Sequence, residues 1–167
     1  MSFLYPGEYI DSTYSIDFDK LYKEGYRGII FDIDNTLVTH GSPADERAIA
    51  LFKHLKELGF SCLVLSNNKE PRVKSFAKQV GIKYIYKAGK PKPSGYRTAM
   101  ERLAQIRKQL FCGRSDITDI IGANLTGIRS ILVAPIDPHE EIQIVLKRFI
   151  EKPVIACYKR HLKKVNK

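Results

Sequence analysis

The sequence predicts an α/β protein whose central β-sheet is parallel and doubly wound. From residue 28 onward, short apolar runs typical of strands alternate with longer patterns of helical periodicity. Strands that alternate with helices form right-handed βαβ units, and successive units place helices on both faces of a parallel sheet. With 167 residues, one Rossmann-like domain with one hydrophobic core is expected over residues 1–167.

The first βα unit of this sheet is the clearest in the sequence. Residues 28–31 are an apolar run that suits a central strand of a parallel sheet. A helix should follow, with Ser42 as its N-cap, Pro43 at the first helical position and Asp45 at the third. Helical periodicity then continues until Gly59, where this helix is predicted to end.

The remaining elements follow the same alternation. Further strands are predicted over residues 60–65, 83–86, 110–112 and 130–133. Further helices are predicted over about 70–80, where Gly81 ends the pattern, over about 94–106, and near 119–123. By contrast, residues 1–27 show no clear period, so we expect them to pack across the domain as an N-terminal arm.

Composition excludes several classes of protein. Hydrophobic residues make up 44% of the chain and charged residues 28%, which excludes a wholly disordered or fibrous protein. No apolar run approaches the roughly 18 residues of a membrane-spanning helix, and the start does not resemble a signal peptide, so a cytoplasmic location is expected. The three cysteines, Cys62, Cys112 and Cys157, lack CxxC spacing, so we interpret them as small buried hydrophobic residues.

The formal net charge of +10 is unevenly distributed. From Lys147 onward, eight basic residues accompany the single acid Glu151, and residues from about 150 to 167 form a basic segment without a recognisable motif. Such a segment suits an anionic partner, which leaves an anionic membrane surface, RNA and a phosphorylated substrate as candidates. The alternative is a solvated tail that keeps the protein soluble.

Two carboxylates mark the end of the first strand, in the phrase FDIDNTL. Asp32 and Asp34 are two positions apart, with Thr36 a further two positions on, so a loop leaving the strand can aim both acids into one crevice. In such a pair, one acid can remain ionised as a nucleophile or metal ligand. The other, with a raised pKa, can give and take protons.

Two further polar positions follow strands or loops of the same sheet. The second strand is followed by Ser66 and Asn67, whose hydroxyl and nearby backbone N–H groups could hold a phosphate oxygen. Lys90, in the phrase AGKPKP, could supply a fixed ammonium to neutralise a phosphoryl group. Turn capping and an exposed loop lysine are the structural alternatives at these positions.

These motifs, in this order, resemble those of the haloacid dehalogenase (HAD) superfamily. With the later phrase GANLTGIRSILV and the early phrase LYPGEYIDS, the chain is similar to the YqeG-like phosphatases of subfamily IIIA over residues 3–150. The resemblance implies a HAD-like fold and a Mg²⁺-dependent phosphoric monoester hydrolase. In this family pattern Asp32 forms an aspartyl-phosphate, Asp34 transfers protons, and Ser66, Asn67 and Lys90 bind phosphate.

The metal site is where the chain departs from the family pattern. Gly113, Thr118 and Asp119 fit the phrase Gly-Asp-x-x-x-Thr-Asp, but Arg114 occupies the position of its first, metal-ligating Asp. The resemblance therefore implies Mg²⁺ ligands from Asp32, Asp34 through its backbone carbonyl, and Asp119, with Asp116 as a substitute for the missing acid. A guanidinium in that position should weaken Mg²⁺ binding.

Only about thirty residues separate Asp34 from Ser66, which leaves no room for a cap domain. An uncapped site favours a large substrate, a headgroup at a membrane surface, or capping by another subunit of a homo-oligomer. YqeG-like proteins resemble phosphatidylglycerophosphate phosphatases, which suggests a lipid phosphate as substrate. The alternative interpretation of Arg114 is a catalytically weakened HAD-fold module that binds RNA, a ribosomal particle or another protein.

Overall fold

The computed structural model describes residues 8–103, 108–114, 117–137 and 139. The chain divides into two compact units, residues 1–136 and 137–167, and the fold below is that of the first. The basic segment over about 150–167 and Cys157 lie outside the described residues, and the expectation of one domain over residues 1–167 stays a prediction. Within the described ranges, no helix is both long and apolar enough to cross a bilayer.

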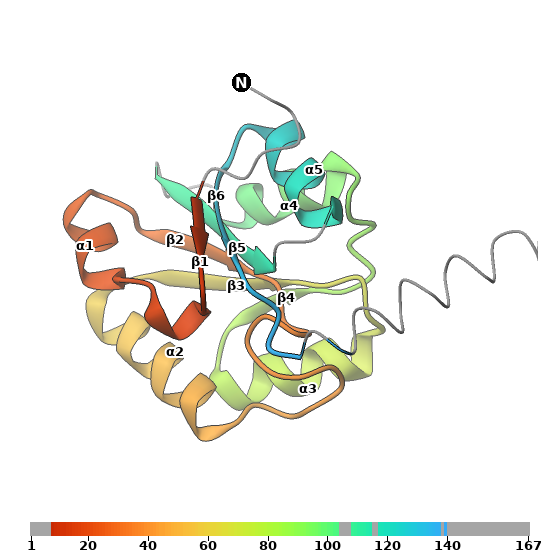
Figure 1. Ribbon diagram of the computed structural model, residues 1–167, viewed down its shortest axis with the longest axis horizontal. Helices are drawn as coiled ribbons and strands as arrows, with labels where there is room; N and C mark the ends of the chain where they lie inside the picture. Colours follow the sequence, from red (N-terminus) through yellow and green to blue (C-terminus); the bar gives the residue numbers. More distant parts are fainter. Residues whose placement is uncertain (1–7, 104–107, 115–116, 138, 140–167) are drawn as a thin grey trace, which may run out of the picture. The chain divides into compact units, whose positions relative to one another are not determined.

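A six-stranded sheet forms the centre of this unit, in the order β1-β6-β5-β2-β3-β4. Every neighbouring pair is parallel, which confirms the predicted doubly wound α/β fold (Figure 1). The strands are β1 (Glu8–Ile10), β2 (Gly28–Phe31), β3 (Ser61–Leu65), β4 (Lys83–Ile85), β5 (Gln109–Arg114) and β6 (Arg129–Val133). β2 lies between β3 and β5, with Phe31 opposite both Val64 and Cys112.

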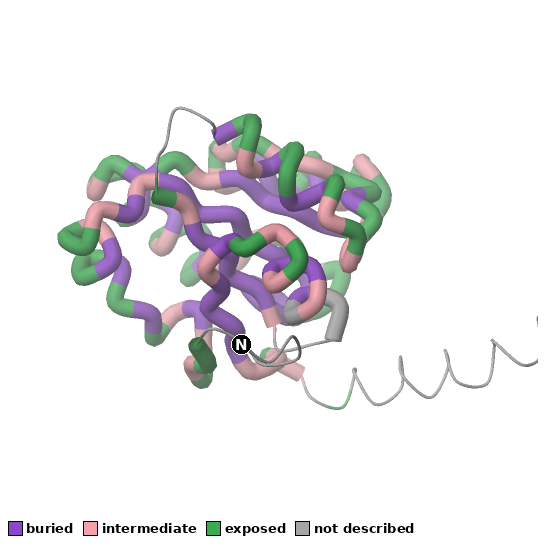
Figure 2. The backbone as a smooth tube through the Cα atoms, turned by 90° about the horizontal axis from the view of Figure 1, so that it is seen from above, coloured by how far each residue is buried: buried purple, intermediate pink, exposed green. Residues whose placement is uncertain are grey.

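Helices cover both faces of the sheet, with α4 and α5 on one side and α1, α2 and α3 on the other (Figure 1). They are α1 (Phe18–Lys23), α2 (Glu46–Leu58), α3 (Glu70–Val80), α4 (Pro93–Arg102) and α5 (Ile117–Thr126), with a 3₁₀ helix, η1, at Thr13–Ser15. Alternate residues of β2 face opposite sides: Ile29 and Phe31 join one core cluster, and Ile30 joins the other. The central strand β2 is buried along its length, and most of β5 and β6 is buried too, whereas the edge strands β1 and β4 are partly exposed (Figure 2).

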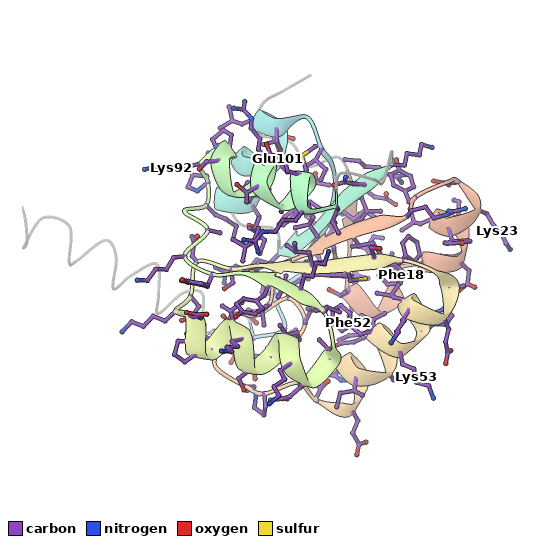
Figure 3. The ribbon with its side chains drawn as sticks, turned by 180° about the vertical axis from the view of Figure 1, so that it is seen from behind. Phe18, Lys23, Phe52, Lys53, Lys92 and Glu101 are labelled. Carbon is purple, nitrogen blue, oxygen red and sulfur yellow. The ribbon has the colours of Figure 1, made fainter. Side chains whose placement is uncertain are left out.

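Aromatic side chains fill the core on the α1–α3 side. Phe52 of α2 packs edge-on against Phe31, with ring centroids 5.2 Å apart, and against Phe76 of α3 at 6.3 Å. Phe18 at the start of α1 lies 6.3 Å from Phe31, and Figure 3 shows Phe18 and Phe52 pointing inward from their helices. This packing fixes β2, the strand that leads to the acid pair.

Several predicted boundaries need correction. The N-cap of α2 is Asp45, whose carboxylate accepts from the Ala48 amide, so Ser42 is outside the helix and hydrogen-bonds to Thr39. Ser42 and Asp45 are both favourable N-cap residues, and the helix begins after Asp45, the one nearer the amphipathic pattern. β5 extends to Arg114, so Arg114 belongs to a strand and not to the following loop.

The N-terminal segment, for which no period was predicted, forms regular structure in its described part. Residues Glu8–Ile10 add a parallel edge strand beside β6, and the chain then forms η1 and α1. Phe18 and Leu21 of α1 are buried in the core. A three-residue strand and a six-residue helix are too short to show a hydrophobic period, which is why the sequence pattern did not reveal them.

No cap domain interrupts the described part of the fold. Between Asp34 and Ser66 the chain contains only a loop, α2 and β3, and between Ser66 and Lys90 only a loop, α3 and β4. The prediction of an uncapped domain is therefore confirmed for these residues. Cys112 is fully buried in the sheet, and burial raises the pKa of its thiol to about 12, as expected for a structural cysteine.

Candidate active site

The acid pair lies at the carboxyl edge of the sheet, directly after β2. The Asp32 amide still donates to the Cys112 carbonyl of β5 at 2.9 Å, which continues the strand pairing to the first acid. The chain then turns sharply, because the amides of Thr36 and Leu37 both donate to the Ile33 carbonyl. We call residues 32–38 the nucleophile loop. Within it, the Thr36 hydroxyl donates to Asp32 Oδ2 at 3.1 Å.

A buried charge cluster joins three of the predicted site residues. Lys90 Nζ lies 2.6 Å from Asp32 Oδ1 and 2.9 Å from Asp119 Oδ1. The side chains of Lys90, Asp32 and Asp119 are 5%, 8% and 1% exposed. Burial alone would lower the pKa of Lys90, but the two carboxylates outweigh it and raise that pKa above its ordinary value. Lys90 is therefore an ammonium held between two acids.

Lys90 is buried, whereas the next lysine in the sequence is not. Lys92, two residues further on, is exposed and points away from the protein in Figure 3. The backbone of Lys90 is held by Asn67, whose side-chain Oδ1 accepts from the Lys90 amide at 2.8 Å and whose Nδ2 donates to the Lys90 carbonyl at 3.0 Å. The structure thus assigns Asn67 a contact with Lys90, and phosphate binding by Asn67 stays a prediction.

Ser66 is placed at the same edge, one residue beyond β3. Its side chain is buried, and its hydroxyl accepts from the Asn68 amide at 3.1 Å. Its own amide and carbonyl pair with Ile85 and Ala88, so the position is fixed from both sides. Ser66, Asn67, Lys90 and the acids therefore gather around one edge of the sheet, as the parallel-sheet argument predicted.

Asp119 is supported by residues that lie outside the predicted site. The Tyr96 phenol donates to Asp119 Oδ1 at 3.2 Å, and the Tyr96 ring packs edge-on against Phe111 at 5.2 Å. The backbone allows this close packing at Gly122, where a Cβ would lie 2.3 Å from the Tyr96 ring, and at Gly113, where a Cβ would lie 2.6 Å from Asp119 Oδ2. The available signal was Tyr96 itself, because the hydroxyl of a buried tyrosine usually has a polar partner.

Asp34 is held apart from this cluster by a different set of donors. Its Oδ1 accepts from the Gly41 amide at 3.1 Å and from Arg72 at 2.9 Å, and its Oδ2 accepts from Asn68 at 3.2 Å. Burial alone would raise the pKa of Asp34, but the Gly41 amide, Arg72 and Asn68 outweigh it and lower that pKa below its usual value. The expectation of a raised pKa at this acid is therefore wrong.

Arg72 helps to lower the pKa of Asp34 from a distant part of the sequence. It lies on α3, 38 residues from Asp34 in the sequence, and both side chains are mostly buried, with 15% and 12% exposed. An opposite charge at this distance favours the ionised carboxylate. Nothing in the residues around FDIDNTL indicated that a helix three elements later would supply that charge.

The carboxylates that meet at Lys90 offer oxygen ligands of the kind that Mg²⁺ binds. Asp32, which follows β2, and Asp119 of α5 both contact Lys90 Nζ. Mg²⁺ is commonly held by one or two carboxylates, with waters and substrate phosphate completing its shell, so this donor set fits the ion. Among the described residues, no group of three His, Cys, Asp or Glu side chains is assembled.

The other predicted ligands stand as follows. The Asp34 carboxylate faces Arg72 and Gly41, so its predicted contribution rests on its backbone carbonyl. Asp116 lies outside the described residues, and Arg114 is the last residue of β5, opposite Val133. Asp116 as a substitute ligand therefore stays a prediction.

Known proteins resemble this chain over most of its length. A family model of haloacid dehalogenase-like hydrolases matches residues 40–124. The chain is 34% identical over 161 residues to Probable phosphatase YqeG of Bacillus subtilis (strain 168), covering 95% of this chain and 93% of that protein. It is 27% identical over 174 residues to the chloroplastic/mitochondrial phosphatidylglycerophosphate phosphatase 1 of Arabidopsis thaliana, covering 97% of this chain and 49% of that protein.

A solved structure shows the same fold. The crystal structure of YfnB from Bacillus subtilis, a proposed HAD-hydrolase with bound magnesium, matches with a TM-score of 0.50 at 15% identity, covering 73% of this chain and 99% of that chain. At this identity the likeness concerns the fold alone. The family resemblance drawn from the sequence motifs is confirmed by the family model and the YqeG match.

Proposed function

Because this chain belongs to the haloacid dehalogenase-like hydrolases, we propose that it is a phosphatase that hydrolyses a phosphomonoester through an aspartyl-phosphate. The observation that supports the proposal is the buried contact of Lys90 with both Asp32 and Asp119 at the carboxyl edge of the sheet. This contact places a cation beside the carboxylate that follows β2. A dianionic phosphoryl group requires such a cation when a second anion attacks it.

In the proposed mechanism, Asp32 attacks the phosphorus in line and the bond to the leaving oxygen breaks. Lys90 and Ser66 stabilise the phosphoryl oxygens, and Asp34 transfers protons. The contact with Arg72 favours the ionised form of Asp34, which suits removal of a proton from the water that hydrolyses the aspartyl-phosphate. Asp34 must itself carry a proton before it can protonate the leaving oxygen, and this requires its contact with Arg72 to loosen.

Mg²⁺ would be held by Asp32, Asp119 and the Asp34 carbonyl, and when bound it supplies positive charge to the phosphoryl oxygens. The basic test is phosphate release from a generic phosphomonoester, measured with Mg²⁺ and with a chelator. Release that depends on added Mg²⁺ supports the proposal. Equal release in chelator would contradict the metal requirement.

Arg114 provides a sharper prediction about the metal. Arg114→Asp should tighten Mg²⁺ binding by at least about tenfold and speed turnover, because it replaces a repelling charge with an oxygen ligand. Calorimetry and the Mg²⁺ dependence of turnover measure the effect, while Asp119→Asn should abolish metal dependence in both backgrounds. Unchanged affinity would show that Asp116 or another acid already fills the position. Tighter Mg²⁺ without hydrolysis would favour the binding-module alternative.

We further propose that the substrate is a lipid phosphate at an anionic membrane surface. The matched Arabidopsis protein is named a phosphatidylglycerophosphate phosphatase, and this chain spans about half its length. An uncapped site favours a substrate whose headgroup remains in a bilayer. The basic segment over about 150–167 supplies the charge expected of a chain that binds anionic lipid.

Neutralising this segment should weaken membrane association. Each lysine or arginine near an anionic surface contributes ~1 kcal/mol, so replacing Lys159, Arg160, Lys163 and Lys164 with Gln should reduce vesicle binding by about two to three orders of magnitude. Sedimentation with anionic and with neutral vesicles measures it. If the wild type and the variant sediment equally with anionic vesicles, the segment is a solvated tail.

A further inference from the structure

The N-terminal part of the chain hydrogen-bonds to the nucleophile loop. The Thr13 hydroxyl donates to the Thr36 carbonyl at 2.9 Å, and the Tyr14 phenol donates to the Leu37 carbonyl at 2.5 Å. Thr13 is 1% exposed. Both donors come from η1, which is more than twenty residues away in the sequence from the loop that it contacts.

These contacts are short steps from the predicted nucleophile. The Thr36 hydroxyl donates to Asp32 Oδ2, so the Thr13 hydroxyl is connected to the Asp32 carboxylate through a single residue. Inside the loop, the amides of Thr36 and Leu37 are turned toward the Ile33 carbonyl. The carbonyls of the same two residues face η1, which supplies their side-chain donors.

The donors themselves are well fixed. Ser12 caps η1 by accepting from the Tyr14 amide at 3.2 Å, and β1, just before it, pairs with β6 in the sheet. The Arg47 guanidinium lies 5.0 Å from the centre of the Tyr14 ring. Burial and, next, the charge of Asp45 raise the pKa of Tyr14 to about 12, although Arg47 lowers it, so the phenol keeps its proton and remains a donor.

We propose that Thr13 and Tyr14 are positioning residues of the phosphatase reaction, which hold the nucleophile loop in the geometry that orients Asp32. The inference rests on the proposed function and assigns the N-terminal segment a part in it. A carboxylate that must attack in line is sensitive to its orientation, and a small displacement of a reacting group can cost about a hundredfold in rate. Removing both hydroxyls takes away the two side-chain donors that these loop carbonyls have in the structure.

The test uses the full chain and removes one hydroxyl at a time. Thr13→Val and Tyr14→Phe should each lower kcat about tenfold, and the double variant about a hundredfold, with KM changed by less than about twofold. Thr13→Ser should restore most of the loss, because it returns the hydroxyl. Thr39→Val is the matched control, since Thr39 pairs with Ser42 and not with a carbonyl of the nucleophile loop.

A second measurement does not depend on turnover. Amide hydrogen exchange over residues 32–38 should be faster in Thr13→Val and in the double variant than in the wild type or Thr39→Val. Unchanged exchange, or a fall in kcat that Thr39→Val reproduces, would overturn the inference. A wild type that releases no phosphate would refute the proposed function. An active wild type whose kcat is unchanged by substitution of Thr13 and Tyr14 would refute only their positioning role.

A stability control separates positioning from general loosening. Phe60→Leu removes core packing against Tyr22 of α1 just before β3 begins, away from the loop carbonyls. If it lowers Tm as much as Thr13→Val yet keeps kcat, the effect of Thr13 is specific to the loop. If kcat falls equally in both variants, Thr13 is merely structural.

Discussion

Asp32→Asn is expected to reduce phosphate release by about three orders of magnitude or more, because an amide cannot form the covalent intermediate. Asn nearly matches Asp in size, so the contact with Thr36 can survive and the fold should be kept. Phosphate release with Mg²⁺ measures the effect. Asp11→Asn, which makes the same chemical change at an exposed position, is the control.

This result would decide the role of Asp32. Activity above about a tenth of the wild-type rate would remove Asp32 from the nucleophile role, since loss of a covalent catalyst costs far more. Equal losses in Asp32→Asn and Asp11→Asn would indicate damage to the protein as a whole. Circular dichroism and Tm of the two variants separate these outcomes.

Lys90→Met should impair both stability and catalysis. Removing one partner of a buried ion pair typically costs about 3–5 kcal/mol, and here it leaves two buried carboxylates facing each other. Urea unfolding measures the free energy of unfolding, and phosphate release should fall to near background. Lys92→Met is the matched control because Lys92 is exposed. It should change the free energy of unfolding by no more than ~0.5 kcal/mol and phosphate release by no more than a few-fold.

The pH dependence of this effect has a definite sign. The folded-state pKa of Lys90 is raised above its ordinary value of 10.5. The stability that Lys90 contributes is therefore fully present below that value and is lost only as the pH rises through the higher folded-state pKa. The gap in stability between the wild type and Lys90→Met should thus persist from about pH 7 to about pH 9. A gap that closes in this range would contradict a charged, paired Lys90.

Features that follow from local pattern were predicted well. The apolar run before Asp32 indicated a central strand, and β2 is that strand, buried on both faces between β3 and β5. The stop of α3 at Gly81 was also correct, with Gly81 in the left-handed conformation. Both signals are local, since they depend on a few neighbouring residues whose chemistry favours one backbone conformation.

Features that depend on distant residues were not predicted. Arg72 lowers the pKa of Asp34 from another helix, Tyr96 supports Asp119 from α4, and Thr13 reaches the nucleophile loop from the N-terminal segment. None of these three belongs to the motif that it supports. Their partners are set by the three-dimensional packing of the sheet and helices, which sequence spacing does not report.

In the proposed mechanism, Asp32 carries the phosphoryl group during turnover. The most direct measurement is an acid quench of the enzyme during turnover of a ³²P-labelled phosphomonoester with Mg²⁺, followed by mapping of the labelled peptide. We expect an acid-stable, hydroxylamine-sensitive label on Asp32 in the wild type and none in Asp32→Asn. Steady hydrolysis without protein-bound label, or a label on another residue, would contradict it.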